Sequence, residues 1–278
     1  MLAVKFWKAH GLGNDYLVYE RGQSDPELTP DAVRALCDRH RGVGGDGILE
    51  PRDGAGVADY GVRIWNPDGS VAEKSGNGLR IFAEWLFRER GAKSEFSVWT
   101  EHCRVVCRVS RAFVAVEMGP PTFEPQSVPV TADHALIDGP LALSDTTLAV
   151  TAVGVGNPHC VHFTERPLDE LPWRRWGAEI ERHARFPNRT NVQFARCFGR
   201  AEVEIRIWER GAGETSASGS SSSAVAAAGV QTGRLDPGRI RVVMPGGVLF
   251  VTVSESGLLL EGPVAVVGRF ELAPGFFS

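Results

Sequence analysis

The sequence predicts an α+β fold made of two lobes that arose by duplication, each lobe a curved β-sheet, nearly a barrel, around one central helix. Three short motifs each occur twice, 143 positions apart (206 − 63 = 143). They are Arg-Ile-Trp at 63 and 206, Gly-x-Gly-Asn at 11 and 154, and Gly-Pro at 119 and 262. Ser-Gly follows the tryptophan at the same distance in both copies. Three motifs in one register indicate a duplicated chain.

Short apolar runs punctuated by Gly and Pro supply the expected strands. The runs with the composition and alternation of strands are Val62–Trp65, Phe113–Val116, Ala149–Val153, Val192–Ala195, Glu202–Trp208 and Gly247–Val253. Alternation also predicts one strand through Val98–Cys107, with Cys103 and Cys107 on one face. Cys197 is expected to be a core residue. Strands this numerous and close together argue against a doubly wound parallel sheet.

Two helices are expected, at Leu79–Phe87 and Ser220–Val230. The second consists almost wholly of small residues, and a helix that small and apolar is expected inside a sheet. The duplication divides the 278 residues into an N-terminal lobe at 1–119 and a C-terminal lobe at 120–262, with 263–278 returning to the first. Each lobe is long enough to bury a core of its own.

Composition narrows the class of protein. The net charge of −4 and the scattered basic residues argue against a nucleic-acid partner. No apolar stretch approaches the ~20 residues that span a bilayer, and the start lacks a signal-peptide layout, so we expect no membrane association and a cytoplasmic location. Five cysteines, an odd number, fit reduced thiols, and their spacing matches no familiar zinc pattern, so no metal is expected.

The candidate chemistry lies at the two helix starts. Ser75-Gly76-Asn77 and Ser218-Gly219-Ser220 each combine free backbone N–H groups with the positive end of a helix dipole, which favours binding of an anion. Each serine could instead be a simple N-cap. If the lobes pack about a pseudo-two-fold axis, Ser75 and Ser218 approach one cleft from opposite sides, which suits inversion of a stereocentre.

Polar turns recur around these helix starts. Asn14, Asn66, Asn157 and Asn191 each lie in a turn flanked by Gly, Pro or Thr, and the pair Glu209-Arg210 precedes the second serine. A guanidinium suits a carboxylate and a glutamate suits an ammonium group. Neutral amides with one Glu–Arg pair therefore predict a zwitterionic amino acid as the ligand. His10 and His162 are expected to be structural.

An ordered set of motifs runs along the whole chain: His10-Gly11-Leu12-Gly13-Asn14-Asp15, Gly42-Val43-Gly44-Gly45-Asp46-Gly47, Asn66-Pro67-Asp68-Gly69-Ser70, Ser75-Gly76-Asn77-Gly78, Gly156-Asn157-Pro158-His159, Thr190-Asn191-Val192-Gln193, Glu209-Arg210-Gly211-Ala212-Gly213-Glu214-Thr215 and Pro245-Gly246-Gly247. This set resembles that of the diaminopimelate epimerases. The resemblance implies a cofactor-independent isomerase that interconverts LL- and meso-diaminopimelate with two bases, in lysine and peptidoglycan-precursor biosynthesis, and it allows a homodimer.

The resemblance also implies a role for each site residue. Ser75 and Ser218 occupy the catalytic positions, with His159 near the first and Glu209 near the second. Substrate contacts would come from Asn14, Asn66, Gly76, Asn77, Asn157, Asn191, Glu209, Arg210, Gly219 and Ser220.

The chain departs from this family at both catalytic positions, where the family pattern has cysteine and this sequence has serine. A thiol ionises near pH ~8.5, and lower beside a helix N-terminus, whereas an alcohol ionises far higher. Three functions remain open: an epimerase that uses serines, a related amino-acid racemase or hydroxyproline-type dehydratase, and a diamino-acid binding protein without turnover.

Overall fold

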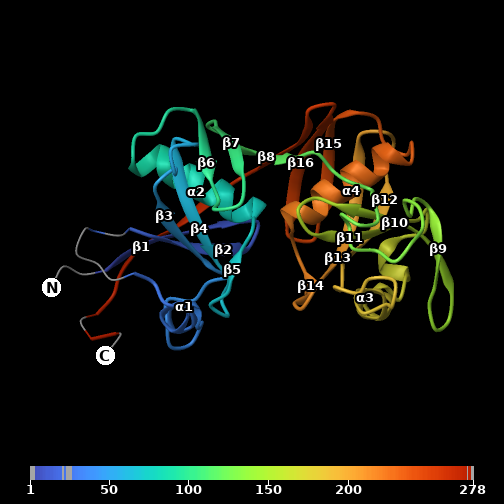
Figure 1. The fold of residues 1–278 in the computed structure, drawn as a ribbon, viewed down its shortest axis with the longest axis horizontal. Coiled ribbons are helices and arrows are strands. Elements are labelled where there is room, and N and C mark those ends of the chain that lie inside the picture. Colours follow the sequence, from blue (N-terminus) through green and yellow to red (C-terminus); the bar gives the residue numbers. More distant parts are fainter. Residues whose placement is uncertain (1–3, 21, 23–26, 274, 277–278) are drawn as a thin grey trace. The chain divides into compact units, whose positions relative to one another are not determined.

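The computed structural model describes residues 4–20, 22, 27–273 and 275–276, and its chain divides into two compact units (Figure 1). Unit 1 comprises Met1–Val116 with Gly262–Ser278, and unit 2 comprises Glu117–Glu261. The sequence placed these boundaries at 119/120 and 262/263. The proline-rich segment after residue 119 thus lies within unit 2, where Thr122 pairs with Gly154.

Unit 1 is built on one mixed sheet. Its strands are β1 (Lys5–Gly11), β2 (Asn14–Tyr19), β3 (Ile48–Arg52), β4 (Tyr60–Trp65), β5 (Val71–Ala72), β6 (Glu95–Trp99), β7 (Arg104–Val109), β8 (Val114–Gly119) and β18 (Ala265–Glu271). Pairing gives the order β18-β1-β2-β3-β4-β6-β7-β8, and β5 pairs with the end of β4. The β2–β3 and β4–β6 pairs are parallel and the others antiparallel. The helices are α1 (Pro30–Cys37) and α2 (Gly76–Glu89).

Unit 2 repeats this plan. Its strands are β9 (Gly139–Ala142), β10 (Thr147–Gly154), β11 (Pro158–Phe163), β12 (Asn191–Cys197), β13 (Glu202–Glu209), β14 (Gly213–Thr215), β15 (Gly238–Met244), β16 (Gly247–Ser254) and β17 (Gly257–Gly262). The order is β9-β10-β11-β12-β13-β15-β16-β17, again with two parallel pairs, β11–β12 and β13–β15. The helices are the 3₁₀ turn η1 (Leu168–Glu170), α3 (Trp173–Glu181) and α4 (Gly219–Gln231).

Apart from β9, β18 and η1, the elements of the two units match at the displacement found in the sequence. Subtracting 143 from the bounds of α3 and α4 gives 30–38 and 76–88, which coincide with α1 and α2 to within one residue. The same subtraction brings the bounds of β10 to β17 to within two residues of those of β1 to β8. The internal duplication is therefore a property of the fold as well as of the sequence.

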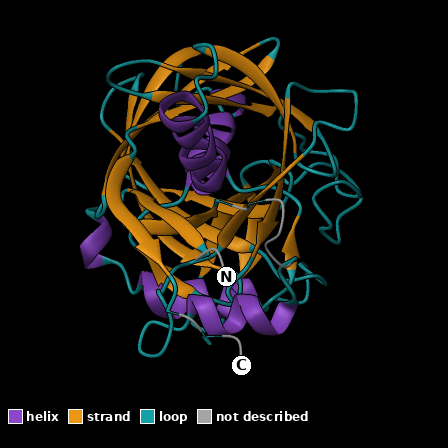
Figure 2. Ribbon diagram, turned by 90° about the vertical axis from the view of Figure 1, so that its left-hand side faces the viewer, coloured by secondary structure: helices purple, strands orange, loops and turns teal. Residues whose placement is uncertain are grey.

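Each unit encloses one helix in its curved sheet, as predicted (Figure 2). The α2 helix contacts β1, β2 and β7, and α4 contacts β10, β11, β12, β13, β15 and β16. The small side chains of α4 make this close packing feasible, since a Cβ at Gly229 would lie 2.5 Å from Leu235 Cδ1. Burial on several sides excludes water from most of the length of each helix.

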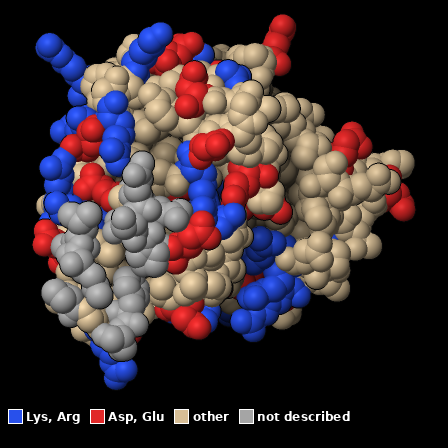
Figure 3. Space-filling view, turned by 60° about the vertical axis from the view of Figure 1, so that its left-hand side comes forward, with Lys and Arg blue, Asp and Glu red and all other residues tan. Residues whose placement is uncertain are grey.

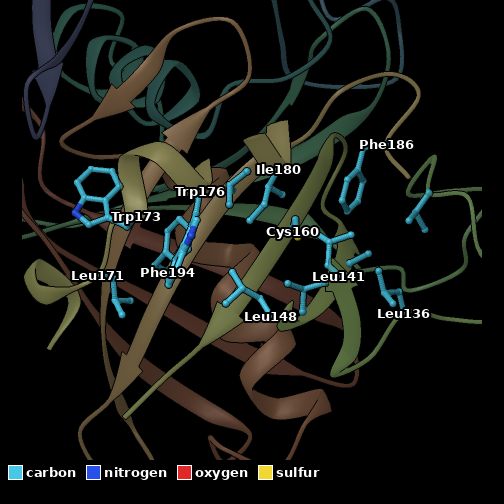
Figure 4. Packing of buried hydrophobic residues seen from close by; sticks show 14 of the residues in the cluster. Leu136, Leu141, Leu148, Cys160, Leu171, Trp173, Trp176, Ile180, Phe186 and Phe194 are labelled. Atoms are coloured by element: carbon cyan, nitrogen blue, oxygen red, sulfur yellow. The ribbon is translucent and has the colours of Figure 1, made fainter. Parts of the chain in front are cut away.

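Each sheet also packs on its second helix. In unit 1, the buried residues Val33 and Leu36 of α1 join Leu17 and Ile48 in one cluster. In unit 2, the core lies between α3 and the sheet (Figure 4). There the rings of Trp173 and Trp176 lie 6.5 and 6.3 Å from that of Phe194. These cores stabilise the two sheets, whose strands are connected by the polar turns of the candidate site.

Two predictions from the sequence are wrong. The run Val98–Cys107 is not one strand: β6 and β7 form a hairpin whose turn is closed by Thr100, the backbone N–H of which donates to Cys103 O at 3.0 Å. Cys103 therefore lies in a turn, and of these two cysteines only Cys107 is buried. Cys197 is half-buried at the end of β12 rather than in the core. The alternation of apolar and polar residues continues across the turn, so the sequence pattern does not indicate that the strand ends there.

Charged side chains of both signs are interspersed over the face seen in Figure 3. Many charged side chains of the described residues are paired; for example, Arg39 binds Asp15 and Asp46 at 2.6 and 2.7 Å. Among the described residues, none of the helices has both the length and the apolar character needed to cross a bilayer. In the same part of the chain, His, Cys, Asp and Glu do not gather in a group that could hold a metal ion.

Candidate functional site

In unit 1, the candidate site begins at the first turn of α2. Ser75 is the N-cap residue, with an extended backbone at φ −139°, and its Oγ accepts the N–H of Gly78 at 3.0 Å. The same Oγ lies 3.1 Å from Tyr16 Oη. Gly76 and Asn77 follow as buried residues. Ser75 is thus an N-cap, as the simpler interpretation held, and it also presents a half-buried hydroxyl at the helix start.

A line of directed hydrogen bonds orients the amides beside Ser75. The buried Arg80 donates from Nη2 to Asn77 Oδ1, and Asn77 Nδ2 donates to Asn14 Oδ1 at 3.0 Å. Asn14 Nδ2 then donates to Asp46 Oδ2 at 2.8 Å. A cation at one end and a carboxylate at the other fix which way each amide points. Burial lowers the pKa of Arg80 to about 10, which still leaves it protonated at neutral pH.

Asn66 lies in the turn after β4 and is half-buried. Its Nδ2 donates to Ser70 Oγ at 2.9 Å, and its N–H donates to Ser70 O at 2.8 Å. The turn is thus closed by Asn66 itself, the ordinary local role of asparagine in a turn. Asn66 has no hydrogen bond to Asn14, Ser75 or Asn77 among the interactions described.

In unit 2, the equivalent site begins at the first turn of α4. Ser218 is the N-cap residue at φ −151°, and its Oγ accepts the N–H of Ser221 at 3.4 Å and lies 3.4 Å from Ser220 Oγ. Ser218 and Gly219 are buried, and Ser220 is half-buried. The side-chain hydrogen bonds of Ser218 within the described residues therefore involve only α4 itself.

His159 is completely buried behind this helix start. Its Nε2 lies 2.8 Å from Asn157 Oδ1, and Gln193 Nε2 lies 3.0 Å from both His159 Nδ1 and Ser221 Oγ. Since an amide oxygen only accepts and an amide NH₂ only donates, the ring is the neutral Nε2–H tautomer. Burial lowers the pKa of His159 to about 3. His159 is therefore a weak base here, and its evident task is to orient Asn157.

We expect this neutral His159 to make the native state sensitive to acid. Its folded pKa of about 3 lies below the unfolded value of ~6.5, so its contribution to stability is complete above pH ~6.5 and is lost as pH falls toward 3. Between pH 7 and 4, urea unfolding should show the wild type losing on the order of 3 kcal/mol more than His159→Gln. His102→Gln, at an exposed position, is the control; equal acid sensitivity of all three proteins would contradict the assignment.

Glu209 ends β13 and Arg210 begins the turn that follows, and the buried carboxylate of Glu181 holds the residues on either side of this pair. Glu181, at the end of α3, accepts Trp208 Nε1 at 2.9 Å and the N–H of Gly211 at 2.7 Å, and it pairs with Arg189. Burial alone would raise the pKa of Glu181, but these hydrogen bonds and the charge of Arg189 hold it below its ordinary value.

Asn191 fixes the middle of this turn. Its Oδ1 accepts the N–H of Arg210 at 3.0 Å, and its Nδ2 donates to Pro158 O at 2.9 Å. Asn191 is buried, and its amide hydrogen-bonds backbone on two sides. The Arg210 side chain is exposed and, among the described residues, donates a hydrogen bond to Asn188 O at 3.2 Å. The turn presents a guanidinium to solvent on a rigid support.

Comparison with known proteins decides the family. The family model for diaminopimelate epimerase matches residues 6–124 and 151–267. The chain is 42% identical to diaminopimelate epimerase 2 of Nostoc sp., over 99% of this chain and 98% of that one. It is 38% identical to the diaminopimelate epimerase of Synechocystis sp., over 94% and 96% of the two chains.

The chain belongs to the diaminopimelate epimerase family. Solved structures of lower identity share its fold. A hydroxyproline epimerase from Agrobacterium vitis superposes with a TM-score of 0.69 at 16% identity, covering 98% of this chain and 93% of that one. A PhzF-family protein from Bacillus anthracis gives 0.67 at 15% identity, covering 98% and 100%. The α+β fold with two lobes, predicted from the repeat, is confirmed.

Within each unit, the structure brings together part of the predicted set. Ser75, Gly76, Asn77 and Asn14 form one connected group in this diaminopimelate epimerase fold, as do Ser218, Gly219, Ser220, His159 and Asn157 in the other unit. The roles of Glu209, Arg210 and Asn191 toward a ligand, and the approach of Ser75 to Ser218, stay predictions.

Four residues that support these groups were not predicted from the sequence: Tyr16, Arg80, Glu181 and Gln193. Gln193 lies inside a motif that carries the family resemblance, and Tyr16 directly follows another, but neither had a stated task. Arg80 lies five residues after Ser75 in the mostly apolar run Leu79–Phe87, and a charged residue there was the available signal. Glu181 had no signal in the sequence, since it is brought to Trp208 only by tertiary packing.

Proposed function

We propose that the chain is a cofactor-independent epimerase that interconverts LL- and meso-diaminopimelate, with Ser75 and Ser218 transferring protons on opposite faces of one α-carbon. The observation that carries the proposal is the pair of equivalent helix starts, each capped by a serine whose hydroxyl lies among backbone N–H groups. Membership of the diaminopimelate epimerase family supplies the substrate class.

In the proposed reaction, one hydroxyl removes the α-proton while the other delivers a proton to the opposite face. The α-carboxylate lies at the N-terminal ends of α2 and α4, whose free N–H groups and dipoles stabilise the negative charge that develops there. Asn14 and Asn77, held by Arg80 and Asp46, face the reacting end. Asn66, Asn157, Asn191 and Arg210 hold the far end, and Glu209 takes an ammonium group.

Exchange of the α-hydrogen tests this function. Protein incubated with LL- or meso-diaminopimelate in deuterated water should incorporate deuterium at the α-carbon as the isomers interconvert. Binding without exchange would instead indicate a diamino-acid binding protein, and loss of water from a hydroxylated substrate would indicate the dehydratase alternative. No heat of binding in calorimetry with any stereoisomer would reject the substrate class.

Replacing Arg210 with alanine should weaken binding of diaminopimelate by about 2–4 kcal/mol, which is ~30- to 1000-fold in Kd, because a carboxylate loses its charged partner. The fold should be unaffected, since the Asn191 contact is to the backbone N–H of Arg210. Titration calorimetry measures the change, with Arg182→Ala as the control at an exposed position of α3's end. Equal affinity of the Arg210→Ala and Arg182→Ala variants would remove Arg210 from the site.

A further inference from the structure

Tyr16 lies directly behind the Ser75 hydroxyl. Its Oη is 3.1 Å from Ser75 Oγ. Tyr16 is 7% exposed, whereas Ser75 is half-buried. A ligand arriving from solvent therefore meets the alcohol of Ser75 before the phenol of Tyr16.

The hydrogen bonds of Ser75 leave its own proton free to point elsewhere. A hydroxyl oxygen has two lone pairs and one proton. One lone pair accepts Gly78 N–H at 3.0 Å, and the other can accept the Tyr16 O–H at 3.1 Å. In that arrangement the Ser75 proton points to neither partner. The Tyr16 phenol then donates to the Ser75 hydroxyl, and the Ser75 hydroxyl can donate to a ligand at the start of α2.

The fold makes a specific space for the Tyr16 ring. A Cβ on Gly47 would lie 2.6 Å from Tyr16 Cε1 and 2.4 Å from Trp65 O. Glycine at 47 is therefore required for the ring to lie between β2 and the end of β4. On the other side, Tyr16 pairs with Ala9 across β1 and β2.

The duplication relates Tyr16 to His159, since 159 − 16 = 143. Each unit thus places a side chain with a transferable proton at the same point of its sheet, behind the helix start. The two positions are used differently. Tyr16 contacts Ser75 directly. Among the described residues, His159 connects to Ser218 only through Gln193 and Ser221.

We propose that Tyr16 is the proton-relay partner of Ser75, an inference that rests on the proposed epimerase function. When unit 1 acts as the acid, the electron pair of the α-carbanion takes the Ser75 proton and forms the C–H bond. Ser75 Oγ takes the proton of Tyr16 as the Tyr16 O–H bond breaks, and the electron pair of that bond stays on the phenolate.

In the reverse direction, the C–H bond breaks and its electron pair stays on carbon. Ser75 Oγ takes the α-proton while passing its own proton to the tyrosinate, which restores the phenol. The alcohol is never left as an alkoxide. Because a phenol is a far stronger acid than an alkyl alcohol, the relay gives the serine a proton source that the missing thiol would otherwise supply.

The test compares Tyr16→Phe in two backgrounds, both carrying Ser218→Cys so that the other face has a competent group. With Ser75 present, Tyr16→Phe should lower kcat for epimerisation and α-deuteration by ~100-fold or more, with no change in the Kd measured by calorimetry. With Ser75→Cys added, the same Tyr16→Phe change should cost less than about fivefold, because a thiol needs no phenol behind it. Tyr60→Phe, which removes a hydroxyl from β4 of the same unit, is the matched control.

The outcomes separate the two proposals. An equal loss in both backgrounds, or no loss in either, overturns the relay and leaves the epimerase function in place. If exchange of the α-hydrogen is observed only in variants with Ser75→Cys, the relay is also overturned, because Ser75 is then inactive even with the Tyr16 phenol beside it. Absence of exchange in every variant, including Ser75→Cys with Ser218→Cys, overturns the epimerase function and the relay with it.

Discussion

Replacing both serines with cysteine, Ser75→Cys together with Ser218→Cys, is expected to raise the rate of epimerisation by ~100-fold or more. A thiol ionises near pH ~8.5, and a helix N-terminus lowers that value further, so a thiolate is available where an alkoxide is not. Both hydroxyls lie at such ends, at α2 and α4. A 100-fold increase corresponds to ~2.7 kcal/mol of barrier, a modest part of what a change from alcohol to thiol can supply.

The single changes should give much less than the double change, because inversion requires a competent group on each face and paired catalytic residues are not additive. Of the two, Ser218→Cys should give the larger gain. Ser75 has the Tyr16 phenol 3.1 Å away, whereas the hydroxyl of Ser218 bonds only to Ser220 and Ser221 in the part of the chain that is described.

Deuterium incorporation and optical rotation follow the reaction, and Ser254→Cys, at an exposed position of β16, controls for an added thiol. A wild-type rate equal to that of the double variant would show that the serines are already fully activated. Inactivity of both proteins with binding intact would leave a binding protein.

Glu181→Gln should destabilise the native state by about 1–3 kcal/mol. The carboxylate is 3% exposed and accepts from Trp208, Gly211 and Arg189. The amide removes the negative charge that balances Arg189, whose side chain is 42% exposed, and its NH₂ group faces a donor, so a buried N–H group of Trp208 or Gly211 loses its acceptor. Urea unfolding measures the loss, with Glu165→Gln, at an exposed position, as the control.

The same change should also weaken ligand binding, because Trp208 and Gly211 flank Glu209 and Arg210. A native Glu181→Gln protein with unchanged stability and unchanged Kd for diaminopimelate would show that Glu181 does not support this turn.

The sequence was sufficient for the fold because the repeat is a long-range signal. Strands and helices of the two units correspond at the displacement of 143 residues that the sequence shows. The helix starts at Ser75 and Ser218 were predicted from local capping chemistry. The predictions that failed concern a local turn and the burial of one side chain. The turn at Thr100–Cys103 interrupts a continuous alternation, and sequence spacing cannot reveal it.

The supporting residues of the site were harder to predict for a different reason. Arg80 orients Asn77 from one turn away on the same helix, but Gln193 and Glu181 meet their partners across 34 and 27 positions of sequence. A single sequence offers no measure of such pairs. The low pKa of His159 likewise follows from complete burial, which becomes visible only in the folded chain.

The two equivalent tryptophans show how far the halves have diverged since the duplication. Trp65 Nε1 donates to Glu50 on β3, whereas Trp208 Nε1 donates to Glu181 on α3. The position equivalent to Glu50 is Gln193 (193 − 143 = 50), which binds His159 instead. Because Glu181 accepts the Trp208 indole, position 193 does not have to supply that acceptor, and its glutamine binds His159. The halves are consequently not interchangeable: two identical copies would have the same residue at positions 50 and 193, and could not combine the Glu50–Trp65 pair with the present His159 network.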